Sequence, residues 1–76
     1  MYTDAMRRAF YSIEAPKNFK IEISDNDTFL VIKLNEKSFI HMTHDEKIQA
    51  VQYVARVKNA LEQNGAIVLV TREPLK

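Results

Sequence analysis

Hydrophobic positions recur at helical spacing near the start of the chain. In the segment from Thr3 to about Glu14, the apolar residues return every three to four positions, as on one face of an amphipathic helix. These residues are Tyr2, Met6, Ala9, Phe10 and Ile13. Thr3 is placed to cap the helix. Pro16 is expected to end it, because the residue before a proline disfavours helical backbone.

Three further segments have strand patterns. Residues 19–23 alternate apolar and charged side chains, which is typical of a strand with one buried face. Residues 28–34 are apolar on both faces, which favours a central strand or a second covering layer. The turn formers of residues 24–27 predict a hairpin between these two strands. The apolar run of residues 66–71 predicts a buried third strand.

A long helix is predicted between the second and the last of these strands. Thr43 and Glu46 have the spacing of a capping box, and the helix is expected to run to about Asn64, with Gly65 as the left-handed residue after it. Residues 38–42 before the helix form either a short strand or an irregular connection, and we favour the strand.

The expected order of elements is therefore α-β-β-(β)-α-β, in a single domain of residues 1–76. A helix between two strands of one sheet makes a right-handed crossover, which places the last strand parallel to a hairpin strand. The sequence predicts a small α+β two-layer sandwich, with the helices packed on one face of a three- or four-stranded sheet.

Composition agrees with an ordinary globular domain and limits what else the chain can be. Of the 76 residues, 46% are hydrophobic and 28% charged, and the formal net charge is +1. There is no cysteine, so we expect no disulfide. The longest apolar run, residues 66–70, is far too short to span a membrane. Asp4, Arg7 and Arg8 interrupt the region where a signal peptide would be apolar, so a cytoplasmic protein is expected.

Catalytic and metal-binding chemistry is not expected. His41 and His44 have a spacing seen in zinc sites, but further ligands are missing from the pattern. Gly65 is the single glycine, so a glycine-rich phosphate loop is excluded. A small core also leaves little room for a pocket of a few hundred cubic ångströms. We therefore expect no enzyme activity, no catalytic residues, no metal and no cofactor.

The long helix carries two stripes when it is projected at 100° per residue. The predicted inner stripe contains Ile48, Val51, Val54, Ala55 and Leu61, with Val57 at its margin. The opposite stripe contains Gln49, Gln52, Arg56, Asn59 and Gln63, with no acidic residue. A solvated helix face usually mixes Glu and Lys. The polar stripe is thus either a face in water or a candidate surface for binding a partner.

Two other surfaces are candidates for binding. If both helices lie on one side of the sheet, the other side carries some of Phe29, Val31 and alternate residues of 67–70. An open apolar face there predicts self-association as a homodimer, with Phe29 and Val31 as candidate residues, or binding of a partner. The alternative is that the first helix covers this face. Arg7 and Arg8, with Tyr11, form a small basic cluster that either binds a partner or only assists solubility.

The sequence therefore supports three hypotheses of function. The first is a small non-catalytic accessory or regulatory protein, of the kind phages and mobile elements encode, that binds a host or partner protein. The second is a nucleic-acid-binding protein in which basic residues contact phosphates. Those residues would be Arg7, Arg8, Lys17, Lys20 and Arg56. The third is a self-assembling structural component.

Overall fold

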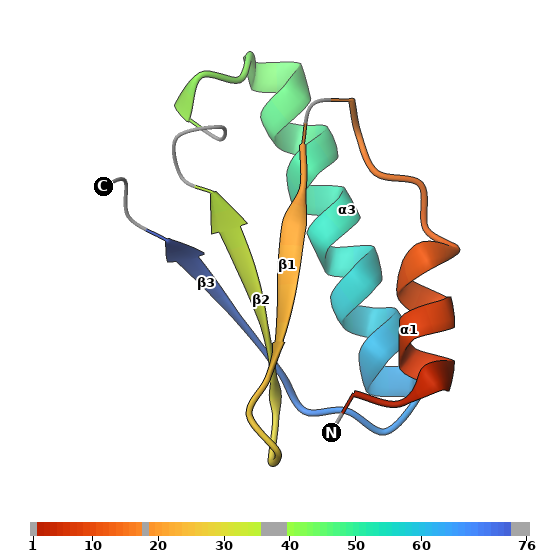
Figure 1. Ribbon diagram of the computed structural model, residues 1–76. Coiled ribbons are helices and arrows are strands. Elements are labelled where there is room, and N and C mark those ends of the chain that lie inside the picture. The colour runs from red at the N-terminus through yellow and green to blue at the C-terminus, as the bar shows by residue number, and fades with distance from the viewer. Residues whose placement is uncertain (1, 18, 36–39, 74–76) are drawn as a thin grey trace.

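The computed structural model describes residues 2–17, 19–35 and 40–73 of the chain. Two helices and three strands follow one another in the order α-β-β-α-β (Figure 1). They are α1 (Asp4–Tyr11), β1 (Ile21–Asp25), β2 (Leu30–Asn35), α3 (His44–Gln63) and β3 (Val68–Glu73). This order confirms the predicted α+β class. Within the described residues, no helix is long and apolar enough to cross a membrane.

The strands form one mixed sheet in the order β1-β2-β3. β1 and β2 are an antiparallel hairpin, with Ile23 opposite Ile32. α3 then carries the chain back so that β3 runs parallel to β2, with Ile32 beside Val70. The central place of β2 explains why this strand is apolar on both faces.

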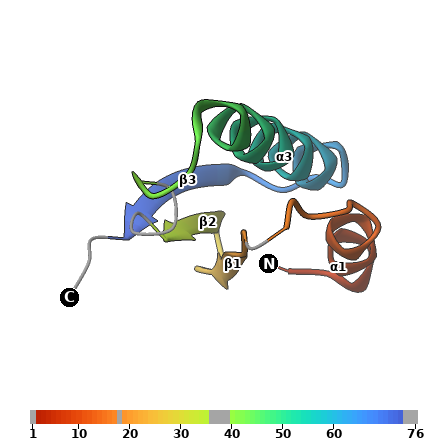
Figure 2. The same cartoon turned by 90° about the horizontal axis from the view of Figure 1, so that it is seen from above.

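The helices and the sheet make two layers. Viewed along the sheet, α3 lies across one face, while α1 lies beyond β1 and against α3 (Figure 2). Neither helix covers the opposite face of the sheet. The two-layer arrangement predicted from the sequence is confirmed, and the alternative in which the first helix covers the far face is wrong.

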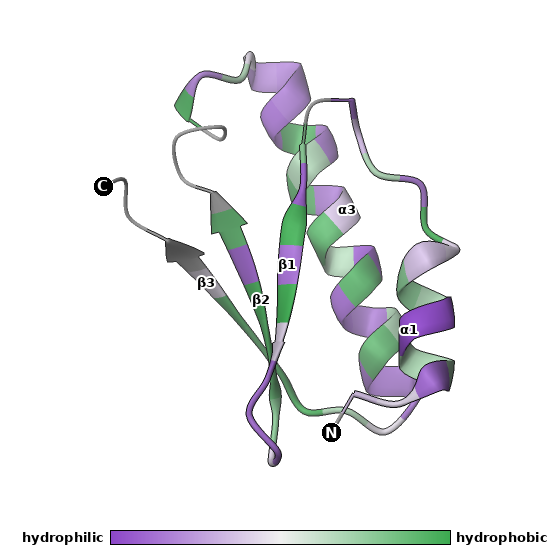
Figure 3. Ribbon diagram, in the orientation of Figure 1, coloured by the Kyte–Doolittle hydropathy of each residue, from purple (hydrophilic) through white to green (hydrophobic). Residues whose placement is uncertain are grey.

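The core lies between α3 and the sheet, with α1 closing it at the side of β1. The largest fully buried side chains come from the connection before β1, from β2 and from α3. They are Phe19, Leu30, Ile32, Val57 and Leu61. Alternate residues of β2 point toward α3, as the period of two in a strand requires. Figure 3 shows hydrophobic residues along β2 and in bands along α3.

The stripe of α3 that faces the core differs from the predicted one. Val54, Val57 and Leu61 are buried, but Ile48 is 43% exposed, Val51 is 56% exposed and Ala55 is also exposed. Their places are taken by Ala50 and Tyr53. The prediction selected the most hydrophobic side chains of the helix. The residues that are buried are instead decided by which side of the helix is turned toward the core.

Several boundaries and one element also differ from the prediction. α1 ends at Tyr11 rather than near Glu14, and the residue that follows it, Ser12, has an Oγ that donates to the Ala9 carbonyl at 2.7 Å. β3 begins at Val68 rather than at residue 66. Of the predicted optional strand at 38–42, residues 38 and 39 lie outside the described part of the chain. Residues 40–42 form a helical turn and a bend rather than a strand.

The hairpin turn and both helix starts follow the predicted chemistry. In the turn, the Asp27 backbone N–H donates to Asp25 Oδ1 at 2.9 Å, and Asp27 has a left-handed backbone with φ of 66°. Thr3 caps α1 by accepting from the Met6 N–H. At the far end of α3, Gly65 has φ of 94°, as a left-handed residue after a helix requires.

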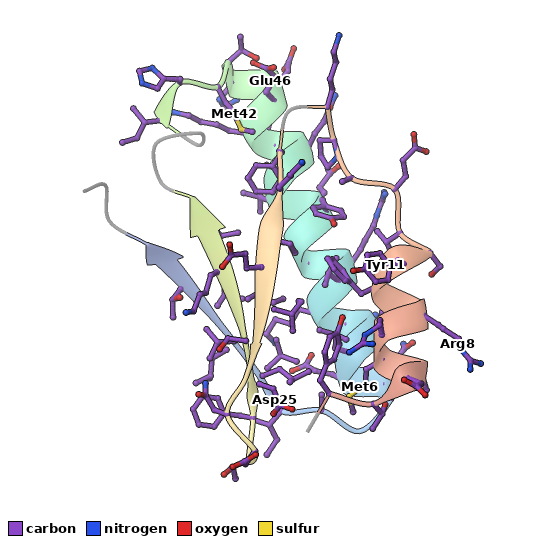
Figure 4. All side chains as sticks on the ribbon, viewed as in Figure 1. Met6, Arg8, Tyr11, Asp25, Met42 and Glu46 are labelled. Carbon is purple, nitrogen blue, oxygen red and sulfur yellow. The ribbon has the colours of Figure 1, made fainter. Side chains whose placement is uncertain are left out.

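The capping box at the start of α3 is present in full. The Glu46 N–H donates to Thr43 Oγ1 at 3.2 Å, and the Thr43 N–H donates to Glu46 Oε1 at 2.8 Å (Glu46 stands at the upper end of α3 in Figure 4). We expect Thr43→Ala to lower the free energy of unfolding by about 1 kcal/mol, because one N–H at the helix start loses its acceptor. Urea denaturation measures the change, with Thr28→Ala, an exposed loop threonine, as the control. Equal stability of the two variants would contradict this role.

The capping box also makes the free energy of unfolding depend on pH in the acid range. The hydrogen bonds from the Thr43 backbone N–H, and secondly from its side chain, hold the pKa of Glu46 below its usual 4.5. The carboxylate therefore stabilises the fold fully above the pKa that Glu46 has in the unfolded chain, and this contribution is lost as pH falls through the lower pKa of the folded state. Glu46→Gln, which cannot titrate, lacks this part of the acid dependence.

Candidate functional site

A groove on the surface of the molecule runs between α3 and the connection from α1 to β1. Its volume is about 360 Å³. The side of α3 contributes Gln49, Gln52, Tyr53 and Arg56, and the connection contributes residues 14–17. We call this feature the polar groove. The expectation that the chain has no room for such a hollow is wrong, because the groove lies between two surface segments and does not remove volume from the core.

Aromatic packing holds the connection in place over α3. Phe19 is only 1% exposed, and its ring meets the Tyr53 ring edge to face, with centroids 6.1 Å apart. The Phe19 backbone N–H donates to the Pro16 carbonyl at 3.2 Å, which turns the chain toward β1. A residue that is buried in the core thus fixes the outer wall of the polar groove.

Tyr53 forms the floor of the polar groove. Its side chain is buried, and burial raises the pKa of its hydroxyl above 10.0. No buried side-chain oxygen or nitrogen in the described residues lacks a hydrogen-bond partner, and the Tyr53 hydroxyl bonds to no described residue. The hydroxyl therefore reaches solvent, so the floor presents one polar atom on a rigid aromatic ring.

The three remaining groove residues of α3 are exposed and unengaged. Gln49, Gln52 and Arg56 form no hydrogen bond or ion pair with another described residue. On the other side of the same helix, by contrast, Lys58 Nζ lies 2.9 Å from Glu62 Oε2. The groove residues thus keep their donors and acceptors available for a ligand.

The rest of the predicted polar stripe continues along α3. Asn59 and Gln63 are exposed, one and two turns beyond the groove, and they do not line it. The predicted alignment of the five stripe residues on the solvent side of α3 is therefore present, and three of the five line the polar groove.

The arginines of α1 lie apart from the polar groove. The Arg7 guanidinium is stacked over the Tyr2 ring, 5.2 Å from its centroid. Arg8 projects away from the molecule (Figure 4). Neither residue lines the groove, which takes its positive charges from Lys17 and Arg56. The cations of the nucleic-acid hypothesis are thus divided between separate surfaces in the described part of the chain.

The open face of the sheet carries residues of both β2 and β3. Val31 is only 8% exposed and Phe29 is half-buried. The most exposed apolar side chains of this face belong to β3 and the residue before it, where Ile67 is 62% and Leu69 49% exposed. Leu69 lies beside Val31 in register, so the two strands share the face.

The exposure of β3 differs from the buried strand that its apolar run predicts. The apolar run of residues 66–71 predicts a buried strand, yet within it Val68 alone is fully buried and Val70 is 41% exposed. A continuous apolar run is typical of a strand covered on both faces. Here the strand stands at the edge of the sheet, and no signal in the run itself distinguishes an edge strand from a central one.

The two histidines lie just before and at the start of α3. His41 and His44 are both exposed, and the described residues contain no group of three or more histidine or acidic side chains that could hold a metal ion. Comparison of the chain with protein-family models, curated proteins and solved structures found no match.

Proposed function

We propose that this protein is a small non-catalytic binding module, with an accessory or regulatory role, that recognises a partner protein through the polar groove. The observation that carries the proposal is the set of unengaged side chains, Gln49, Gln52 and Arg56, beside the solvent-facing hydroxyl of a buried tyrosine. Arginine and tyrosine are enriched where binding energy is concentrated in protein interfaces. The rigid floor means that little side-chain entropy is lost when a ligand binds there.

The groove fits a polar segment of a partner better than a phosphate backbone. Its cations, Lys17 and Arg56, are accompanied by the acidic Glu14, so it is not a strongly basic surface. Nucleic-acid binding depends on several clustered cations that neutralise successive phosphates. A single carboxylate of a partner could instead pair with Arg56, whose planar guanidinium favours two parallel hydrogen bonds.

The spacing of the groove residues suits an extended peptide segment. Gln49, Gln52 and Arg56 lie three and four residues apart, so they stand on one side of α3 in successive turns of 5.4 Å pitch. Their amide groups both donate and accept hydrogen bonds, as a partner's peptide groups require. We therefore infer that the glutamines bind main-chain groups and that Arg56 binds an acidic side chain of the partner.

The test is a charge reversal in the groove. The double variant Gln52→Glu/Arg56→Glu lowers the net charge by three and places carboxylates where the acidic partner group would bind. In quantitative pull-downs from the native host, we expect proteins captured by the wild type to be recovered about tenfold less with this variant, a loss of about 1.4 kcal/mol. Both residues are exposed, so thermal unfolding is expected to change little.

A matched control places the same charge change on α1. Ala5→Glu/Arg8→Glu also lowers the net charge by three at two exposed positions, remote from the polar groove. This control is expected to retain the partner. Loss of the partner with the α1 variant but not with the groove variant would overturn the proposal and place the contact on α1.

A further inference from the structure

The two edges of the sheet are not alike. The outer side of β1 is flanked by α1, whereas the outer edge of β3 pairs with no strand in the described part of the chain (Figure 2). The Leu30 N–H donates to the Ile67 carbonyl at 2.8 Å, so Ile67 and the residues alternating with it turn their backbone groups toward β2. The N–H and C=O groups of Val68 and Val70 therefore point outward from the free edge.

This edge carries apolar side chains on both faces. Leu69 shares the open face with Val31, while Val70 lies beside Ile32 on the face toward α3. Val51 of α3, 56% exposed, is turned to the β3 side, because the opposite side of the helix lines the polar groove. Free edges in native proteins are usually protected by lysine, proline or a bulge. Residues 67–71 contain no charged residue and no proline.

We propose that the β3 edge binds a second copy of this chain, by antiparallel pairing of β3 with β3 of the copy around a two-fold axis at Leu69. A strand that completes this edge must present apolar side chains on both faces, and β3 itself is such a strand. The axis places Leu69 opposite its own copy and Val68 opposite Val70, and it keeps Arg72 and Glu73 outside the apolar pairs. The two three-stranded sheets then form one sheet of six strands.

The backbone geometry fits this register. With the axis at Leu69, Val68 and Val70 of the copies form hydrogen-bonded pairs, which uses the outward N–H and C=O groups of both residues. Leu69 then forms a non-hydrogen-bonded pair, in which side chains approach most closely. If the two-fold axis passed between two residues, a residue whose N–H and C=O point outward would stand opposite one whose N–H and C=O point toward β2, and the hydrogen bonds could not form. The axis must therefore pass through a residue.

A dimer formed through this edge has to bury more surface than the strand edge alone offers. Stable dimers bury about 800 Å² on each partner, roughly a seventh of the 5474 Å² surface described here. The strand edge is narrow, so the contact must include the flanking faces. Those faces carry Ile67 and Leu69 on one side and Val51 and Val70 on the other.

Cysteine cross-linking tests the register directly, because the chain contains no cysteine of its own. In a non-hydrogen-bonded antiparallel pair the Cα atoms are about 4.5 Å apart, which lies within the range that a disulfide spans. Under mild oxidation we expect Leu69→Cys to become a disulfide-linked dimer within minutes. The control Tyr11→Cys, at a 75% exposed position on α1, should react at least about tenfold more slowly. Equal rates for the two variants would overturn the proposal.

Light scattering tests the assembly without a cross-link. The wild type is expected to reach twice its 8.8 kDa mass as its concentration rises, whereas Leu69→Asp stays at 8.8 kDa, because two carboxylates then face each other across the axis. Tyr11→Asp should behave as the wild type does. A wild type that stays monomeric at every concentration overturns self-pairing and leaves the edge to a strand of another protein. The groove variant Gln52→Glu/Arg56→Glu should still dimerise, so failure of this proposal is distinct from failure of the proposed function.

Discussion

Replacing Ile32 by aspartate is expected to leave the chain unfolded at neutral pH. Ile32 is fully buried at the centre of the middle strand, with Ile23 on one side and Val70 on the other. Aspartate has too short a side chain to reach water from this position, so its charge would be buried without a partner, at a cost of several kcal/mol. Loss of the isoleucine packing adds about 2–5 kcal/mol. A domain of this length has a free energy of unfolding of only about 4–11 kcal/mol.

The matched control places the same residue on the neighbouring strand. Leu69→Asp puts the charge on the open face of β3, where the side chain is 49% exposed, and its circular dichroism spectrum is expected to stay close to that of the wild type. Ile32→Asp is expected to show the spectrum and urea response of an unfolded chain. A cooperative unfolding transition for Ile32→Asp would contradict the placement of β2 at the centre of the sheet.

Replacing Phe19 by alanine is expected to lower the free energy of unfolding by about 3–5 kcal/mol. Phe19 is 1% exposed and is the largest of the fully buried side chains. Its removal leaves a cavity beside Tyr53 and also breaks their edge-to-face contact, which adds about 0.5–1.5 kcal/mol. Urea denaturation measures the change, and the midpoint should fall while the slope stays the same.

Two further measurements test whether the loss of stability comes from the packing of Phe19 in the core. Tyr11→Ala removes an aromatic ring that is 75% exposed, and its effect on stability is expected to stay within about 0.5 kcal/mol. At a temperature where Phe19→Ala remains folded, its partner binding should also weaken, because the connection over the polar groove loses its anchor. A Phe19→Ala protein as stable as Tyr11→Ala would show that Phe19 does not hold this connection.

The order of elements was predictable because each element carries a local signal. The capping box of Thr43 and Glu46 sets the start of α3, and Gly65 follows its end with the positive φ that only glycine adopts at little cost. The apolar character of β2 on both faces predicted a central strand, and the connection through α3 predicted the parallel pairing with β3. Signals of this kind depend on neighbouring residues in the chain.

The surfaces were less predictable because they depend on contacts between distant segments. Ile48 and Val51 are more hydrophobic than Ala50 and Tyr53, yet the latter pair is buried in the core. The angle at which α3 meets the sheet decides this, and hydrophobicity alone does not encode that angle. The polar groove likewise exists only because Phe19 brings the connection against α3, so Gln49, Gln52 and Arg56 were predictable as a stripe but not as the wall of a hollow.

The parallel pairing of β2 and β3 also has a consequence for the kinetics of folding. β1 and β2 are joined by a tight turn and can associate as soon as both have been synthesised, because the loop between them is short. Leu30 and Val68, by contrast, are 38 positions apart in the sequence, and closing so long a loop is slow unless the intervening chain is already ordered. Once α3 has formed, fewer flexible residues separate the two strands, and the loop between them closes faster. Until it forms, one side of the hairpin stays bare, and chains at high concentration are most prone to misassociate during this interval.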